Sequence, residues 1–262
     1  MDNLKLSKEL PIGFMDSGLG GLSVLREAVH LMPNEDFIYY GDSANAPYGT
    51  KPPELIRTLT FKVVEKLLKR GIKGLAVACN TATSAAVRPL REKYPELPIV
   101  GIEPAVKPAA VYNHGGRVIV MATPMTIRQP KFHHLLDKYK DMAEIVSVEC
   151  KGLMEYVEHG ELHGAELNMY FEEHLRPYLT DDTETIVLGC THYPFLRPQL
   201  REFLHNDNIK LIDGSRGTSM ELMRQLKEKD LLQDDTHKGS ITIENSSPDP
   251  EMVKLSYKLL NS

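Results

Sequence analysis

Two ten-residue stretches, GLAVACNTAT at residues 74–83 and TIVLGCTHYP at residues 185–194, share one pattern. In each, an apolar run ends in a cysteine, and a polar turn with hydroxyl side chains follows. An uninterrupted apolar run is typical of a strand in a parallel sheet that helices cover on both faces. The repeated pattern therefore predicts two copies of one strand, turn and helix, each with a thiol where the strand ends.

The rest of the chain alternates in the same way. Most of the strand-like runs are separated by segments of helical composition, such as residues 53–70 and 219–229, which is typical of βαβ units with parallel strands. We predict strands at residues 12–16, 36–42, 74–79, 99–103, 117–123, 144–150, 185–190, 209–213 and 240–245. The sequence thus predicts an α/β fold with doubly wound parallel sheets.

A second pair of stretches favours an internal duplication. FMDSG at residues 14–18 and VMATP at residues 120–124 both indicate strand ends that turn into helices. The similarity is short, so coincidence between two βα turns remains the alternative. We expect two pseudo-symmetric domains with the active site in the cleft between them: a first α/β domain of residues 1–101 completed by residues 207–262, and a second of residues 102–206.

Composition excludes several classes of protein. Of the 262 residues, 42% are hydrophobic and 26% are charged, which is typical of a folded globular protein. The 31 Lys and Arg residues against 36 Asp and Glu give a net charge of -5, and no basic run suits nucleic acid. No apolar stretch reaches the roughly 20 residues of a membrane helix, and the first ten residues do not read as a secretory signal. We expect a cytoplasmic protein with neither nucleic acid nor membrane as partner.

The turn Asp16-Ser17-Gly18-Leu19-Gly20-Gly21 puts a carboxylate and a hydroxyl at a predicted strand end, ahead of a helix whose first amides can hold an anion. Such strand ends are where ligands bind in open α/β sheets. The turn lacks both the GxGxxG spacing and the Lys of a P-loop, so a plain glycine turn is the alternative.

Three cysteines are present, which suits neither a disulfide framework nor a CxxC metal pair and indicates reduced thiols. Cys79 and Cys190 each stand where a helix begins, and a helix N-terminus favours thiolate. A small buried hydrophobe is the alternative for one such cysteine, but a matched pair is hard to explain by packing. Cys150 is followed by neither a hydroxyl nor a His, and we predict that it is structural.

Two other chemistries use the same residues less well. A zinc site usually has four ligands, and Cys190 and His192 with Cys79 offer no short-spaced pair, so we predict no metal. A cysteine hydrolase would use His192 as the base for one thiol. That interpretation leaves the second cysteine without a role.

Four motifs occur along the chain in the order and spacing of a known family, from residue 12 onward. They are Asp16-Ser17-Gly18 with Gly20-Gly21, Gly41-Asp42 with Pro47-Tyr48-Gly49, Ala78-Cys79-Asn80-Thr81-Ala82-Thr83, and Gly189-Cys190-Thr191-His192-Tyr193-Pro194. With these motifs the chain resembles the cofactor-independent glutamate racemases of the aspartate/glutamate racemase superfamily. The resemblance implies interconversion of L-glutamate and D-glutamate for peptidoglycan synthesis, with no pyridoxal phosphate and no metal.

The resemblance also implies roles for single residues. Cys79 and Cys190 would be the acid/base thiols on opposite faces of the α-carbon, Cys79 for D-glutamate and Cys190 for L-glutamate. Asp16 would assist Cys79, and His192 would assist Cys190 with support from Glu158 on a second-domain helix. The implied substrate-binding residues are Asp16, Ser17, Tyr48, Gly49, Asn80, Thr81, Thr191 and His192.

The chain departs from the family in places. Lys151 follows Cys150 where the family commonly has Pro, which weakens the assignment of Glu158, and Ala46 stands where relatives often carry Cys. The chain also lacks the longer N-terminal extension of relatives that need a cell-wall precursor as activator, so we expect no such requirement.

Two other functions stay open, and so does the oligomeric state, for which a homodimer is one candidate. A racemase of the same superfamily could act on aspartate or another amino acid, because pocket geometry sets side-chain length. A ligand-binding module without catalysis could use the same cleft, although both cysteines argue against it.

Overall fold

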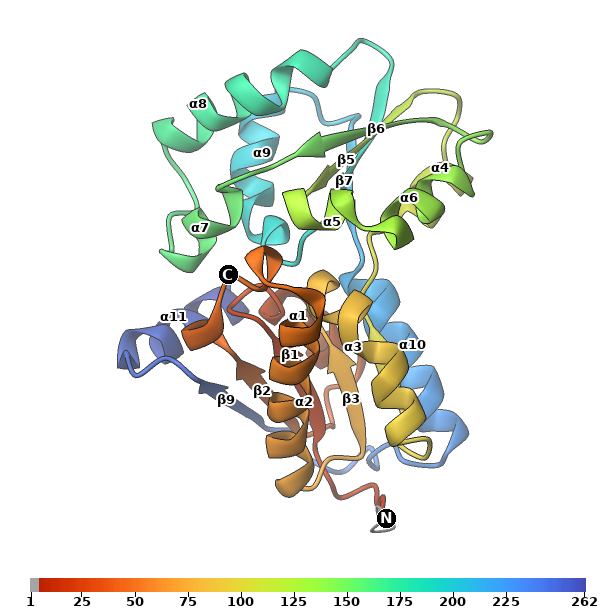
Figure 1. Ribbon diagram of the computed structural model, residues 1–262, viewed down its shortest axis with the longest axis vertical. Coiled ribbons are helices and arrows are strands. Elements are labelled where there is room, and N and C mark those ends of the chain that lie inside the picture. Colours follow the sequence, from red (N-terminus) through yellow and green to blue (C-terminus); the bar gives the residue numbers. More distant parts are fainter. Residues whose placement is uncertain (1–4) are drawn as a thin grey trace. The chain divides into compact units, whose positions relative to one another are not determined.

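A computed structural model describes residues 5–262 and divides them into two compact α/β units (Figure 1). The first unit extends to residue 102 and is completed by residues 215–262, and the second is formed by residues 103–214. Residues 207–214 therefore belong to the second unit, not to the first as the sequence led us to expect. They contain a strand that is hydrogen-bonded into the second sheet.

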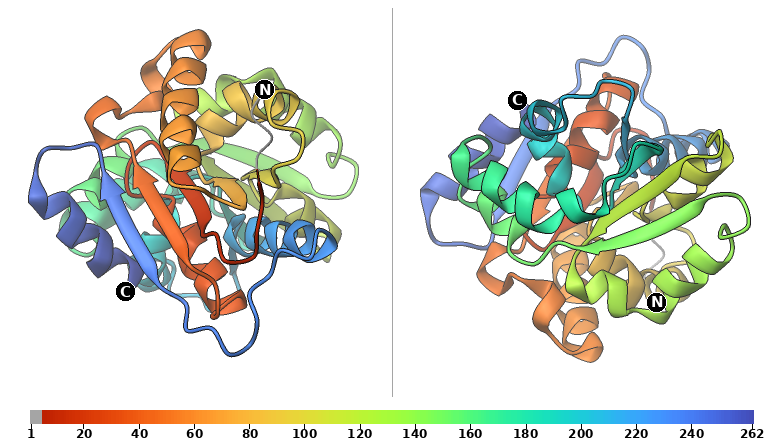
Figure 2. Two further views of the ribbon diagram at one scale, coloured as in Figure 1. Left: turned by 90° about the horizontal axis from the view of Figure 1, so that it is seen from below. Right: turned by 90° about the horizontal axis from the view of Figure 1, so that it is seen from above.

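The first unit is a parallel sheet with helices on both faces. Its elements are β1 (Ile12–Asp16), α1 (Leu22–Leu31), β2 (Phe37–Gly41), η1 (Ser43–Asn45), η2 (Tyr48–Thr50), α2 (Pro53–Lys69), β3 (Gly74–Val77), α3 (Asn80–Lys93), β4 (Ile99–Gly101), α10 (Ser215–Glu228), β9 (Ile241–Asn245) and α11 (Pro250–Leu260). The strand order is β4-β3-β1-β2-β9. Helices α2 and α3 cover one face, and α1, α10 and α11 cover the other (Figure 2).

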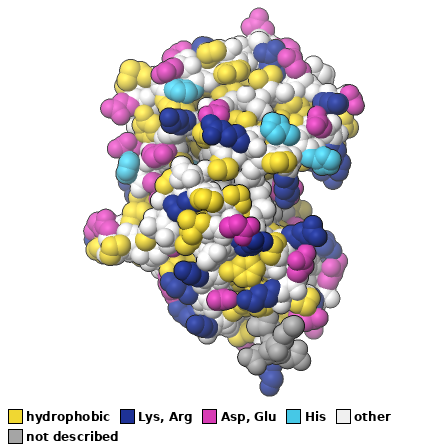
Figure 3. All heavy atoms as spheres, viewed as in Figure 1, with side chains coloured by type: hydrophobic (Ala, Val, Ile, Leu, Met, Phe, Trp, Pro, Cys, Tyr) yellow, Lys and Arg dark blue, Asp and Glu magenta, His cyan; other side chains and the backbone are white. Residues whose placement is uncertain are grey.

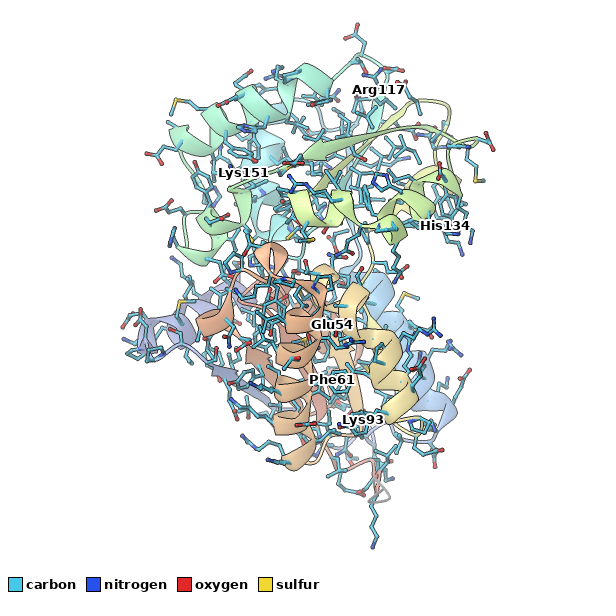
Figure 4. All side chains as sticks on the ribbon, in the orientation of Figure 1. Glu54, Phe61, Lys93, Arg117, His134 and Lys151 are labelled. Carbon is cyan, nitrogen blue, oxygen red and sulfur yellow. The ribbon has the colours of Figure 1, made fainter. Side chains whose placement is uncertain are left out.

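The apolar strands of this sheet explain its burial. Every residue of β1, β2 and β3 is buried, as expected for strands between two helical layers. The two helices of one layer also meet at their outer side, where the Lys93 ammonium of α3 lies 5.2 Å from the centre of the Phe61 ring of α2 (Figure 4). This contact joins the C-terminal end of α3 to the middle of α2.

The second unit repeats this architecture on a smaller scale. Its elements are α4 (Val106–Val111), β5 (Arg117–Ala122), α5 (Pro124–Arg128), α6 (Pro130–Asp137), β6 (Glu144–Glu149), α7 (Leu153–Glu158), α8 (Ala165–His174), η3 (Arg176–Tyr178), β7 (Thr183–Leu188), η4 (Tyr193–Leu196), α9 (Arg197–Leu204) and β8 (Lys210–Asp213). The strand order is β6-β5-β7-β8, all parallel. Alternate residues of β5 form one core with α4 and α6, and α8 packs against α9.

The two sheets share one topology. The order β2-β1-β3-β4 in the first unit matches β6-β5-β7-β8 in the second, strand for strand, and β9 is an addition beside β2. Strands β3 and β7 are therefore equivalent, and Cys79 and Cys190 each follow the equivalent strand by two residues. The predicted fold class, two pseudo-symmetric doubly wound parallel-sheet domains, is confirmed.

One face of the molecule shows the mixed charge of an ordinary protein surface (Figure 3). Acidic and basic side chains are interspersed on the face shown in Figure 3. Across residues 5–262, none of the helices has the length and apolar composition needed to cross a bilayer.

Candidate active site

Parallel strands bring their carboxyl ends to one edge of a sheet, so residues that follow β1, β2 and β3 meet there. In the first unit Asp16 ends β1, and Ser17, Tyr48 and Cys79 follow the three strands; we call these four residues the Cys79 cluster. In the second unit, Cys190 and His192 follow β7 and meet Glu158 from the end of α7, which we call the Cys190 cluster.

Cys79 caps the N-terminus of α3. Its backbone is extended, its carbonyl accepts from the amide of Thr83 at 2.8 Å, and its sulfur accepts from the amide of Ala82 at 3.5 Å. The hydroxyl Oγ of Ser17 lies 3.5 Å from the same sulfur. A helix N-terminus stabilises negative charge, so both contacts suit a sulfur that alternates between thiol and thiolate.

The turn after β1 is held from several sides. The buried Asp16 carboxylate accepts from the amide of Gly18 at 2.8 Å, and the Asp16 carbonyl accepts from the amide of Asp42 at 2.9 Å. The Tyr39 hydroxyl donates to the Gly18 carbonyl at 2.7 Å. Ser17, which contacts Cys79, thus lies between two anchored residues.

Tyr48 enters the same unit from η2, with Gly49 next to it. Its buried hydroxyl donates to Asp42 Oδ2 at 2.7 Å, and the Asn45 amide donates to both oxygens of that carboxylate at 3.1 Å. Burial raises the pKa of the Tyr48 hydroxyl well above its ordinary value, and the bond to Asp42 raises it further. Tyr48 therefore stays a neutral donor.

Asp42 belongs to the Gly41-Asp42 motif found at a predicted strand end, but the sequence assigned it no catalytic or substrate-binding role. The structure shows that it anchors both Tyr48 and Asn45.

The Cys190 cluster is a relay of three ionisable groups. Cys190 Sγ lies 3.6 Å from His192 Nδ1, and His192 Nε2 lies 2.6 Å from Glu158 Oε1. Burial lowers the pKa of His192, but the bonds to Cys190 and Glu158 outweigh burial and hold that pKa well above its ordinary value. The raised pKa favours the protonated form of His192, and a cationic imidazolium stabilises negative charge on a neighbouring sulfur.

The remaining residues of the inferred site lie beside these clusters. Asn80 and Thr81 form the first turn of α3, directly after Cys79, and Thr191 is buried between Cys190 and His192. The structure thus brings Ser17 to Cys79 and Glu158 to His192.

Cys150 differs from the other two cysteines. It is buried at the end of β6, its thiol donates to the carbonyl of Val148 at 3.5 Å, and burial raises its pKa to about 12. It is therefore a neutral thiol, which suits the structural role that we predicted. Lys151 beside it is exposed (Figure 4), and its carbonyl accepts a hydrogen bond from the Tyr170 hydroxyl at 3.0 Å. Although Lys151 stands where the family commonly has Pro, Glu158 still reaches His192.

Within residues 5–262, all three cysteines are thiols, and no group of three or more His, Cys, Asp or Glu side chains is arranged to hold a metal ion. The two clusters contain a pair of thiols that follow the equivalent strands β3 and β7 but have different hydrogen-bond partners. Cys79 has a hydroxyl and a helix amide, whereas Cys190 has an imidazolium backed by a carboxylate. Such groups suit proton transfer to and from a substrate.

Comparison with known proteins places the chain among racemases. Residues 12–217 match the family model Asp/Glu/Hydantoin racemase. A glutamate racemase of Clostridium botulinum (strain Alaska E43 / Type E3) is 53% identical over 255 residues, which are 97% of this chain and 98% of that protein.

Two solved structures are similar over nearly the full length. The Francisella tularensis glutamate racemase in complex with D-glutamate has a TM-score of 0.82 and 27% identity, covering 97% of this chain and 95% of that one. The Escherichia coli glutamate racemase in complex with L-glutamate and the activator UDP-MurNAc-ala has a TM-score of 0.82 and 28% identity, covering 96% and 94%. The similarity therefore includes both units.

Proposed function

The chain belongs to the Asp/Glu/hydantoin racemase family, and from this premise we propose that it is a glutamate racemase that uses two thiols as its acid and base. Relatives that match nearly the whole chain are named glutamate racemase, and solved relatives are bound to D-glutamate and to L-glutamate. The observation that carries the mechanism is the equivalence of Cys79 and Cys190 in two sheets of one topology.

Inversion at the α-carbon needs a base on one face and an acid on the other. A thiol with an ordinary pKa of about 8.5 is partly ionised near neutral pH and serves as either. In the proposed reaction the Cys79 thiolate takes the α-proton of D-glutamate, and the Cys190 thiol gives its proton to the opposite face of the carbanion. The reverse reaction starts from the Cys190 thiolate and L-glutamate. The mechanism requires that both thiols reach one α-carbon.

The partners of each thiol give it a separate proton-transfer environment. Ser17 and the Ala82 amide support negative charge on Cys79, with Asp16 assigned beside them through the family resemblance. His192, backed by Glu158, supports negative charge on Cys190. General acid/base catalysis contributes about 10²- to 10⁴-fold, so donors that hold the carbanion-like transition state must supply the rest.

We propose that hydrogen-bond donors next to the thiols bind the substrate. In our proposal, the hydroxyls and amides of Ser17, Asn80, Thr81 and Thr191 hold the carboxylates of glutamate. Tyr48 and Gly49 complete the binding residues, with Tyr48 fixed by its bond to Asp42.

In the cell, the proposed product is D-glutamate for peptidoglycan synthesis. A cytoplasmic location fits three cysteines that are all thiols. A homodimer is the proposed assembly, and light scattering coupled to size-exclusion chromatography tests it. The partner we propose for the site is glutamate alone.

Circular dichroism tests the activity directly. Purified protein with L-glutamate, no added cofactor and a metal chelator should lose the optical signal until both enantiomers are equal. L-aspartate under the same conditions should react far more slowly. A constant signal with L-glutamate would refute the proposed function, and faster loss with L-aspartate would change the substrate.

A further inference from the structure

Tyr39 stands in the middle of β2 and is fully buried. Its hydroxyl donates to the carbonyl of Gly18 at 2.7 Å, across to the turn that follows the neighbouring strand β1. A buried carbonyl that loses such a donor is costly, because no water replaces it. The Tyr39 hydroxyl is therefore part of what fixes this turn.

Gly18 is held on both of its sides. Its amide donates to Asp16 Oδ1 at 2.8 Å, and its carbonyl accepts from Tyr39. Ser17 lies between the two anchored residues, and its hydroxyl is the group 3.5 Å from Cys79 Sγ. The position of the Ser17 hydroxyl relative to the sulfur thus depends on the conformation of the Gly18 peptide.

Close packing around the turn leaves little room for another arrangement. A Cβ atom at Gly41 would lie 2.5 Å from the Gly18 carbonyl oxygen and 3.4 Å from the Tyr39 ring. A Cβ atom at Gly21 would lie 3.2 Å from the same ring and 2.7 Å from Cβ of Asp16. The two glycines let the turn, the ring and the start of α1 approach closely enough for the hydroxyl to reach Gly18.

From these contacts we infer that Tyr39 is a positioning residue for proton transfer at Cys79, acting through Gly18 and Ser17 without touching the substrate. The inference rests on the proposed racemase function and adds a residue that serves one thiol only. Loss of the hydroxyl should raise the barrier of the Cys79 step and leave the Cys190 step unchanged. A merely structural role would affect both steps alike.

The test uses Tyr39→Phe, which keeps the ring and removes the hydroxyl. We expect kcat/KM to fall about tenfold, the equivalent of roughly 1.4 kcal/mol for one lost buried hydrogen bond. The decisive measurement is the kinetic isotope effect with α-deuterated substrate, run from each enantiomer. Because the Cys79 step becomes more rate-limiting, the isotope effect should rise from D-glutamate and fall from L-glutamate.

Tyr40→Phe is the matched control. Tyr40 neighbours Tyr39 on the same strand, is also buried, and its hydroxyl accepts from Lys66 Nζ at 2.6 Å, away from the turn. Its removal should leave kcat/KM within about twofold of the wild type and both isotope effects unchanged. Gly41→Ala offers a second perturbation, since its new Cβ would push on the Gly18 carbonyl. As with Tyr39→Phe, the isotope effect should rise from D-glutamate and fall from L-glutamate.

A readout without turnover separates this inference from the proposed function. Alkylation by iodoacetamide, followed by peptide mass mapping, should slow down at Cys79 relative to Cys190 in Tyr39→Phe, because the thiolate is the form that reacts and it loses the support of the Ser17 hydroxyl. If the wild type does not racemise glutamate, the proposed function falls and the labelling ratio still decides the inference. Isotope effects that stay as in the wild type, or that change in the same direction from both enantiomers, would overturn the inference, and so would an unchanged labelling ratio.

Discussion

The contact between Glu158 and His192 offers the sharpest mutational prediction. Glu158→Gln keeps the shape of the side chain and an acceptor oxygen but removes the charge from a 2.6 Å contact with His192 Nε2. A hydrogen bond to a charged group contributes about 1.5 to 3 kcal/mol. If the imidazolium acts in proton transfer at Cys190, the loss converts to a decrease in kcat/KM of roughly 10- to 150-fold.

The same variant should change the pH dependence. The wild-type His192 stays a cation above its ordinary pKa because Cys190 and Glu158 outweigh burial, so activity that needs the cation is lost only as pH rises through that elevated pKa. Without the carboxylate the pKa falls, and the alkaline limb of the profile moves to lower pH. His192 stabilises the fold below its unfolded pKa, and that contribution also disappears as pH rises through the folded pKa.

The assay is the initial rate of L-glutamate racemisation by circular dichroism, from about pH 6 to about pH 10. Glu155→Gln, an exposed residue of the same helix, controls for the charge change and should retain the wild-type profile. Activity of Glu158→Gln within twofold of the wild type, with an unmoved alkaline limb, would refute the role of the relay.

Other substitutions separate catalytic groups from structural ones. Cys79→Ala and Cys190→Ala should each abolish racemisation in a folded protein, since each removes the base of one face, and circular dichroism reports both fold and turnover. Cys150→Ala should cost at most a few kcal/mol of stability and leave kcat nearly unchanged, so a folded but inactive variant would contradict its structural role. Lys73→Met should lower the free energy of unfolding by about 3 to 5 kcal/mol, because it leaves the buried Glu35 carboxylate without its ion-pair partner at 2.5 Å, whereas turnover of the folded fraction should persist. Urea unfolding measures that loss, and an unchanged midpoint would contradict it.

Much of the architecture could be predicted because strands buried on both faces leave an uninterrupted apolar pattern. All nine predicted strands are found within residues 5–262, and the repeat seen around the two cysteines corresponds to one shared strand order. The domain boundary at residue 207 was misplaced because Asn and Asp residues there mark the turn between α9 and β8. The pairing of β8 with β7 is a tertiary contact, and the local amino-acid composition does not predict it.

The positions of the candidate site residues at strand ends were predictable, but their contacts were not. Motifs at strand ends pointed to the residues around Cys79 and Cys190, since chain topology alone brings strand ends to one edge of a sheet. The Glu158 contact joins the end of one helix to a turn 34 residues later, and only packing fixes its length. The same holds for Asp42, whose anchoring of Tyr48 depends on how the chain folds back from η1 to η2.

The central claim, that two thiols work on opposite faces, is tested most directly by early-time deuterium labelling. In D₂O the thiol that delivers the proton has already exchanged with solvent, so product formed early should carry deuterium while unreacted substrate remains largely unlabelled. Mass spectrometry of the separated enantiomers should give this result from D-glutamate, where Cys79 takes the proton, and from L-glutamate, where Cys190 does. Unlabelled product, or comparable label in both enantiomers at early times, would contradict the two-thiol mechanism.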